Sequence, residues 1–224
     1  MSIINEDELR IKICEIGRRI YEKGMVAAND GNISVRLNDN EFLCTPTGIS
    51  KGFMTPECIC KVDRLGQLID TDSKFKPSSE MKMHLRVYEK REDVKAVVHA
   101  HPMFATCFAI CGRPLDKPII SEAILTLGKI PVAPYATPST QEVPDSIEPY
   151  LQDYNAVLLA NHGALAWAED LLSAYLRMES LEYYAQMMYR TEQMGDAKEI
   201  SPENVERLYE IRKNMKFVDC DGNK

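Results

Sequence analysis

Three of the four histidines follow apolar segments, at positions where buried strands are expected to end. His99 and His101 form a His-x-His pair after residues 96–98, and His162 follows the apolar run 156–160. Alternate residues of a strand project to the same face, so His99 and His101 can converge, and His162 can reach them from a neighbouring strand. Three neutral imidazoles with one open position are typical of a catalytic zinc site. Hydrogen-bonded core histidines are the alternative, but the pairing and the shared strand-end context favour a metal site.

A carboxylate that could transfer protons beside this metal is found at Glu80. It follows Pro77, Ser78 and Ser79 and is predicted to lie in the first turn of a helix that ends near Lys90. The helix dipole and the free N–H groups of a first turn favour a negative charge there. An ordinary capping acid is the alternative interpretation. Near a metal, the same carboxylate could act both as a ligand and as a proton carrier.

Polar turns could supply an anion site. Ser78 and Ser79 offer hydroxyl and N–H groups at a helix N-terminus, which favours phosphate binding. Residues 29–32 and 45–48 are two further polar turns, in which glycine lets the backbone approach a ligand. Each turn alone is equally typical of a hairpin cap. Together they predict a phosphate site without a basic patch. Lys51 could add a positive charge to this site, but it is interpreted as a solvated lysine.

The elements that must position these residues alternate along the chain. An N-terminal helix is predicted from the N-cap Asn5 to about Gly24. The remaining periodicity predicts strands at 33–37, 42–45, 94–99, 119–120, 130–132 and 156–160, a hairpin over 59–70, and helices over 77–90, 102–110, 143–151, 170–195 and from 201 onward. This order predicts a three-layer α/β/α single domain over residues 1–224, with a frayed tail at 219–224.

The composition limits the classes of function. The chain has 224 residues, 45% of them hydrophobic, and a formal net charge of -7, which disfavours a nucleic-acid or anionic-membrane partner. No window holds the ~18 continuous apolar residues of a membrane helix. The residues after Met1 do not resemble a signal peptide. The seven irregularly spaced cysteines predict reduced thiols, so we expect a cytoplasmic protein.

The motifs together resemble the class II aldolase/adducin family. The resemblance rests on Asn32 in GNISVR, Thr47-Gly48 in TPTG, Ser78-Ser79-Glu80 in PSSE, His99 and His101 in VVHAHP, and His162 in NHG. These motifs occur in the family's order and spacing, and they are most similar to those of its L-fuculose-1-phosphate aldolase branch. The resemblance implies an α/β fold with a central mixed, mainly antiparallel sheet.

The resemblance also implies how the site is built. One Zn2+ per subunit would be held by His99, His101 and His162, and Glu80 would be able to act as a fourth ligand until substrate displaces it. The substrate's phosphate would lie in a pocket that is formed by Asn32, Thr47, Gly48, Ser78 and Ser79. The active sites would lie at the subunit interfaces of a cyclic homotetramer.

The implied chemistry is reversible cleavage of a ketose 1-phosphate into dihydroxyacetone phosphate and an aldehyde, through a zinc-stabilised enediolate that Glu80 protonates. The fuculose-phosphate enzymes carry one tyrosine near the position of residues 119–122 and another near the C-terminus. This chain aligns no tyrosine there, although Tyr209 lies a few residues away. Besides L-fuculose 1-phosphate, the substrate candidates therefore include ketose phosphates with a less polar aldehyde end, such as 5-deoxyribulose 1-phosphate or a methylthio analogue.

Two related activities and one non-catalytic role compete with the aldolase. The sugar-phosphate 4-epimerase branch resembles this chain but carries Asp where this chain has Glu80, so Glu80 favours the aldolase. A methylthioribulose-1-phosphate dehydratase shares the histidines and the glutamate. A non-catalytic adducin-like interaction module would show a degraded histidine triad, whereas His99, His101 and His162 are all present.

Overall fold

The computed structural model describes residues 5–70, 73–195 and 197–214. Within these residues one sheet has seven strands in the order β3-β2-β1-β4-β7-β6-β5. Strands β5 and β6 pair in parallel, and the other neighbouring strands pair antiparallel. The strands are β1 (Asn32–Arg36), β2 (Glu41–Cys44), β3 (Cys60–Asp63), β4 (Ala96–Ala100), β5 (Val132–Ala133), β6 (Ala156–Leu159) and β7 (Gly163–Ala168). The prediction of a mixed, mainly antiparallel sheet is confirmed.

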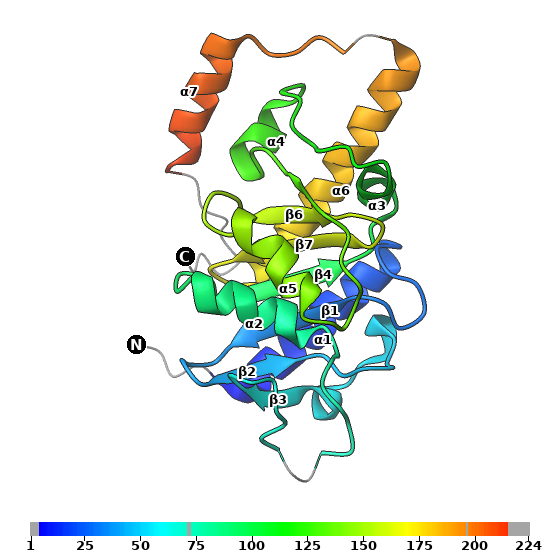
Figure 1. Cartoon of the computed structure of the whole chain (residues 1–224), viewed down its shortest axis with the longest axis vertical. Coiled ribbons are helices and arrows are strands. Elements are labelled where there is room, and N and C mark those ends of the chain that lie inside the picture. The colour runs from blue at the N-terminus through cyan, green and yellow to red at the C-terminus, as the bar shows by residue number, and fades with distance from the viewer. Residues whose placement is uncertain (1–4, 71–72, 196, 215–224) are drawn as a thin grey trace.

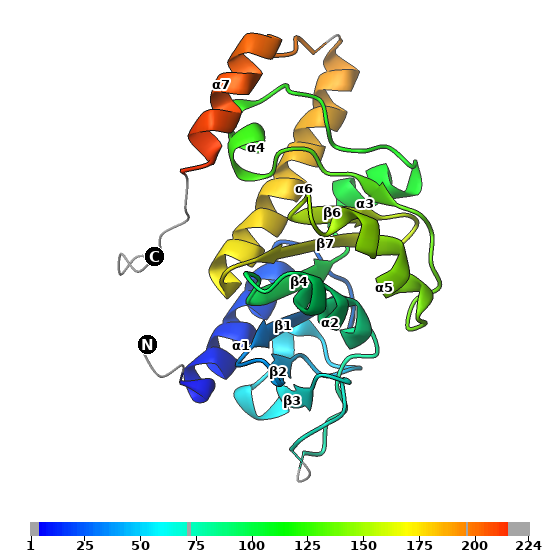
Figure 2. The same cartoon turned by 60° about the vertical axis from the view of Figure 1, so that its left-hand side comes forward.

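Helices cover both faces of this sheet, as Figures 1 and 2 show. One face packs against three helices, α1 (Glu6–Glu22), α3 (Met103–Ile110) and α6 (Leu171–Met194). The other face packs against α2 (Met81–Lys90) and α5 (Glu142–Ile147). The predicted α/β/α layering is therefore confirmed.

The two hydrophobic clusters between the layers follow from strand alternation. In β4, Ala96, Val98 and Ala100 belong to the cluster under α1, α3 and α6. Val97 belongs to the cluster under α2 and α5, and His99 points to that same side because alternate residues share a face. The first metal-ligand candidate is therefore placed between the sheet and α2.

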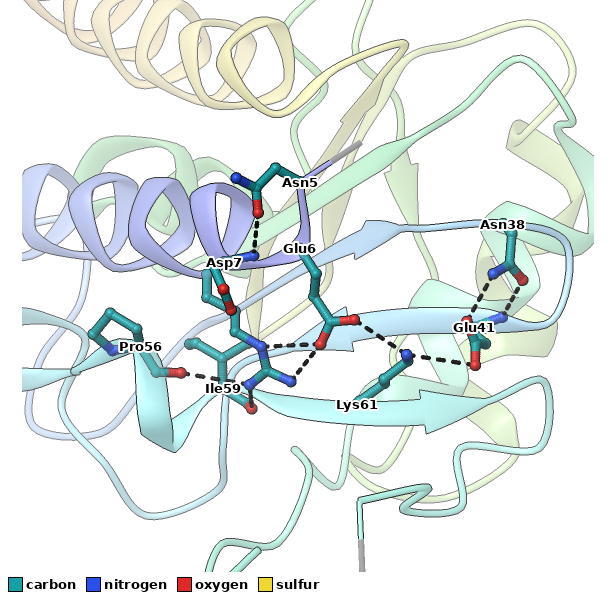
Figure 3. Close-up of polar contacts among 9 residues, drawn as sticks. Asn5, Glu6, Asp7, Asn38, Glu41, Pro56, Ile59 and Lys61 are labelled. Atoms are coloured by element: carbon teal, nitrogen blue, oxygen red, sulfur yellow. Dashed lines mark hydrogen bonds and ion pairs between the residues drawn. The ribbon is translucent and has the colours of Figure 1, made fainter. Parts of the chain in front are cut away.

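Helix α1 begins where the capping signal predicts. The side chain of Asn5 accepts a hydrogen bond from the N–H of Asp7. Figure 3 shows how the start of α1 is then joined to the edge of the sheet: Lys61 on β3 pairs with Glu6 at 3.1 Å and with Glu41 on β2 at 3.5 Å. This ion-pair network fixes the helix over the edge strands.

Several predicted elements differ from the structure. Residues 119–120 form no strand; they precede a short helix, α4 (Ser121–Thr126), because the following residues have helical rather than alternating periodicity. The predicted helix 143–151 is α5 followed by a 3-10 turn, η3 (Glu148–Tyr150). Strand β7 was not predicted at all, because its run GALAWA is buried on both faces and lacks alternation.

The C-terminal part agrees with the prediction as far as it is described. Asp170 caps α6, and its carboxylate accepts a hydrogen bond from the N–H of Ser173. Helix α7 (Pro202–Arg212) begins with proline and packs against α4. The tail 219–224 lies outside the described residues, and the assignment of 1–224 to one domain stays a prediction. None of the helices among the described residues combines the length and apolar character needed to cross a membrane.

Candidate functional site

The three predicted histidines converge on one point. One nitrogen from each of His99, His101 and His162 lies within 4.8 Å of the other two. The Nε2 atoms of His99 and His101 are 3.1 Å apart, and the ring centroids are separated by 4.7–5.1 Å. The predicted meeting of the strand-end histidines is therefore found in the structure.

The strand-end positions differ in detail from the prediction. His99 lies within β4 and His101 follows its last residue, whereas His162 lies in the turn that joins β6 to β7. Asn161 gives this turn its left-handed residue, with φ of 57°. Gly163 lets the turn approach β4 closely, because a Cβ there would lie 2.5 Å from the carbonyl oxygen of Ala100 and 2.6 Å from Cδ2 of His101.

Partners behind the imidazoles orient two of them. Nδ1 of His99 donates to the carbonyl oxygen of Ala164 at 2.9 Å, which leaves Nε2 as the unprotonated nitrogen of the neutral ring. Nδ1 of His101 lies 3.4 Å from a carboxylate oxygen of Asp30. Such outer partners are typical of metal-binding histidines. Burial lowers the pKa of both His99 and His101, which favours the neutral form that binds a metal.

Glu80 faces the histidines from the start of α2. Its Oε2 lies 3.4 Å from Nε2 of His99, and its Oε1 lies 3.2 Å from Nε2 of His162. Asn32 donates to Oε2 at 2.8 Å. Burial alone raises the pKa of Glu80, but its interactions with His99 and His162 and the hydrogen bond from the Asn32 amide lower it overall. Glu80 occupies the N-cap position rather than the predicted first helical turn, and its side chain does not cap the helix.

This donor set fits a divalent cation. Two ligands at 2.0–2.1 Å from a tetrahedral zinc are about 3.3 Å apart, close to the 3.1–3.4 Å separations between the site's nitrogens and carboxylate oxygens. Oε1 of Glu80 is buried without a hydrogen-bond partner among the described residues. A buried carboxylate oxygen without a donor is costly unless a cation or a charged donor faces it.

Two of the three turns predicted to bind phosphate, 45–48 and the one that holds Ser78 and Ser79, lie side by side. The N–H of Thr47 donates to the carbonyl of Lys76 at 2.9 Å, and the N–H of Ser78 donates to that of Thr45 at 3.2 Å. These two N–H groups are therefore engaged within the fold, and the hydroxyls must supply much of any contact with an anion. Thr47, Gly48 and Ser79 are exposed, Ser78 is half-buried, and Asn32 is buried beside Glu80. Their role as phosphate ligands stays a prediction.

Two features of the site were not found from the sequence. Asp30 was noted only as part of a polar turn, and no local spacing indicates that it would pair with His101. Lys51 was interpreted as a solvated lysine, but only 2% of it is exposed. The interpretation was wrong because the residues around Lys51 pack against α1 and bury its stem.

Comparisons with known proteins agree with the geometry. The family model described as "Class II Aldolase and Adducin N-terminal domain" matches residues 11–189. An L-fuculose phosphate aldolase of Methanococcus maripaludis strain S2 is 36% identical, and the match covers 80% of this chain and 93% of that protein. The solved structure of an "L-fuculose 1-phosphate aldolase" aligns with a TM-score of 0.85 at 30% identity and covers 95% of this chain and 100% of that one.

Other relatives carry different names at similar identity. A 5-deoxy-D-ribulose 1-phosphate aldolase of Bacillus thuringiensis serovar kurstaki is 33% identical and covers 89% of this chain and 92% of that protein. A 3-oxo-tetronate 4-phosphate decarboxylase of Pectobacterium atrosepticum is 32% identical and covers 88% of this chain and 89% of that protein. Similarity at this level therefore leaves the choice of substrate to the site itself.

Proposed function

The chain belongs to the class II aldolase and adducin family, and from this membership we propose that it is a metal-dependent aldolase of ketose 1-phosphates. It would cleave L-fuculose 1-phosphate, or a related deoxy- or methylthio-pentulose 1-phosphate, reversibly into dihydroxyacetone phosphate and an aldehyde. The observation that carries the proposal is the intact triad of His99, His101 and His162 with Glu80 between them. An adducin-like module without catalysis has no need of this arrangement.

The histidines and Glu80 would hold the cofactor, for which we propose Zn2+, one per subunit. When bound, such a cation supplies Lewis-acid stabilisation of the negative charge that develops beside the substrate's carbonyl. The chain's own contribution is to hold neutral imidazoles in place: Ala164 and Asp30 orient the rings, and burial keeps His99 and His101 unprotonated.

Glu80 is proposed to move the proton. Breaking the bond between carbons 3 and 4 leaves its electron pair on carbon 3, and the hydroxyl on carbon 4 gives up its proton as it becomes the aldehyde. A proton delivered to carbon 3 then gives dihydroxyacetone phosphate, so cleavage neither consumes nor releases a proton overall. The same carboxylate removes that proton in the synthetic direction. Its position before the first residue of α2 lets the side chain rotate without breaking a helical hydrogen bond, and Asn32 supports its ionised form.

The phosphate is proposed to bind at Asn32, Thr47, Gly48, Ser78 and Ser79. The adjacency of the two turns supports this assignment, because the backbone bonds between residues 45–47 and 76–78 hold both turns beside Glu80. We further propose that the protein is a cytoplasmic homotetramer whose active sites lie at subunit interfaces. Apolar side chains exposed on α3 and α6, among them Met103, Ile110, Tyr183 and Tyr189, support self-association. Light scattering should then give four times the mass of one chain.

A second candidate is decarboxylation of a 3-oxo acid phosphate, which the relative of that name favours. Loss of carbon dioxide leaves an electron pair on the carbon beside the same carbonyl, so the same triad and the same proton donor could serve. The two reactions differ in the group that leaves, which is an aldehyde for the aldolase and carbon dioxide for the decarboxylase.

A substrate panel tests the proposal. The purified, metal-loaded protein is incubated with fuculose, ribulose, rhamnulose and 5-deoxyribulose 1-phosphates and with 3-oxo-tetronate 4-phosphate, and the released dihydroxyacetone phosphate and carbon dioxide are measured. An aldolase releases dihydroxyacetone phosphate and an aldehyde without carbon dioxide. A decarboxylase releases dihydroxyacetone phosphate together with carbon dioxide. An epimerase or a dehydratase releases no dihydroxyacetone phosphate, and that result would reject the proposal.

A further inference from the structure

Lys51 is a buried cation whose partners are neutral. Its Nζ donates to the carbonyl oxygens of Asn29 at 3.0 Å and Ile49 at 2.9 Å. In the part of the chain that the structure describes, no carboxylate lies within ion-pair distance of this ammonium. Burial lowers its pKa to about 8, against the opposing effect of Asp30, the Cys58 thiol and Glu80. A buried charge that meets only carbonyl dipoles is poorly compensated.

The location of Lys51 connects it to both parts of the candidate site. Asn29 precedes Asp30, which faces His101, and Ile49 directly follows the turn 45–48. The 3-10 turn η1 (Lys51–Phe53) packs against α1, where the rings of Tyr21 and Phe53 lie 5.6 Å apart. The stem of Lys51 is therefore fixed, and the ammonium lies next to the carbonyl of Ile49, the residue that follows the turn.

We propose that Lys51 is the charge-bearing residue of the phosphate pocket, acting through the turn 45–48 on the phosphate group of the substrate. The inference rests on the proposed function, since the pocket is proposed to bind a phosphosugar. The residues proposed to contact the phosphate are all neutral, so they supply hydrogen bonds and shape but no positive charge. A dianion in the turn would gain from the nearby ammonium and would in turn compensate it.

The charged groups around Lys51 make this testable by pH. The pKa of Glu80 is lowered, so this carboxylate stays ionised between pH 7 and 9.5, and burial raises the pKa of Cys58, which keeps its thiol neutral at the lower end of this range. Lys51 changes charge within the range. Sulfate is a suitable probe because its own charge does not change in this pH range.

The experiment titrates the metal-loaded full chain with sulfate by calorimetry and compares Lys51→Met with Lys74→Met. Lys74 is exposed, so its replacement removes the same formal charge from the solvated surface. We expect Lys51→Met to weaken sulfate binding on the order of tenfold and to raise KM for the ketose phosphate by a similar factor, with kcat nearly unchanged. Lys74→Met should match the unsubstituted protein.

The pH series provides the second measurement. Sulfate affinity of the unsubstituted protein should fall as the pH rises through about 8, where Lys51 loses its proton, and this fall should be absent in Lys51→Met. If Lys51→Met folds poorly, the unsubstituted protein alone still tests the inference. A sulfate affinity that does not change with pH would overturn it. Equal sulfate affinity in Lys51→Met and the unsubstituted protein also overturns it. Sulfate binding that depends on Lys51 without any cleavage of ketose phosphates would reject the proposed function and leave the role of Lys51 intact.

Discussion

Gly31 offers a sharp test of how the fold positions the metal site. It lies between Asp30 and Asn32, and its φ of 74° is a left-handed conformation. A Cβ at this position would lie 2.8 Å from the carbonyl oxygen of His99 and 2.7 Å from Cγ1 of Val26. The first of these atoms is backbone and cannot rotate away, so Gly31→Ala must displace either β1 or the strand that carries His99.

The loss of stability expected for Gly31→Ala is estimated by comparison with a matched control, Gly24→Ala. Gly24 has nearly the same φ, 67°, but a Cβ added there would have no atom within 4 Å. Gly24→Ala therefore meets only the left-handed strain of about 1–2 kcal/mol, offset by about 0.4–1 kcal/mol from the restricted unfolded chain. Gly31→Ala adds overpacking of about 1–3 kcal/mol to this net strain, so we expect about 1–4.6 kcal/mol of destabilisation. A shift of the ligand by about 1 Å can also lower kcat up to about 100-fold.

Urea unfolding of both variants, with metal content and turnover measured on the same preparations, checks this expectation. Gly31→Ala should lose stability, bound metal and activity together, whereas Gly24→Ala should keep its metal and most of its activity. Equal losses in the two variants would show that the close approach of Gly31 to His99 does not position the site, and the reasoning would be refuted.

Three further variants test the site directly. Glu80→Gln should keep its metal on the three histidines and lose at least about 100-fold in turnover; unchanged turnover would remove Glu80 from the mechanism. His162→Ala should lose most of the bound zinc, as measured by metal analysis, and full retention would mean that another residue is the ligand. Asp30→Ala should weaken metal affinity by about 10–100-fold in competition with a chelator, because the ring of His101 loses its outer partner. An unaltered affinity would show that Asp30 does not orient the ring.

Capping residues and strand alternation in the sequence predicted the features that depend on neighbouring residues alone. The cap at Asn5 and the cap at Asp170 form hydrogen bonds to the N–H groups that such residues are expected to satisfy. The His99–His101 pair was predictable because strand alternation alone places both rings on one side. His162 was predictable as a strand-end residue, but not as part of a turn, since β7 gives no alternating signal.

The remaining features depend on contacts between distant segments. Lys51 carries no mark of burial in its own neighbourhood, and its exposure is decided by the packing of η1 on α1. The hydrogen bond from Asn32 to Glu80 joins residues 48 positions apart in the sequence. Spacing rules cannot supply such pairs, because they follow from which strands are neighbours in the sheet.

The register of β1 against β4 is the step that joins fold to chemistry. Asn32 lies directly opposite His99 in this pair, so both side chains project to the face that α2 covers. A slip of one residue would turn Asn32 to the opposite face and leave Oε2 of Glu80 without its donor. The same slip would move Ile33 and Val35 out of the cluster beneath α1 and α6. The burial of these apolar side chains therefore fixes the register, and the register in turn places the amide that holds the proton carrier beside the histidines.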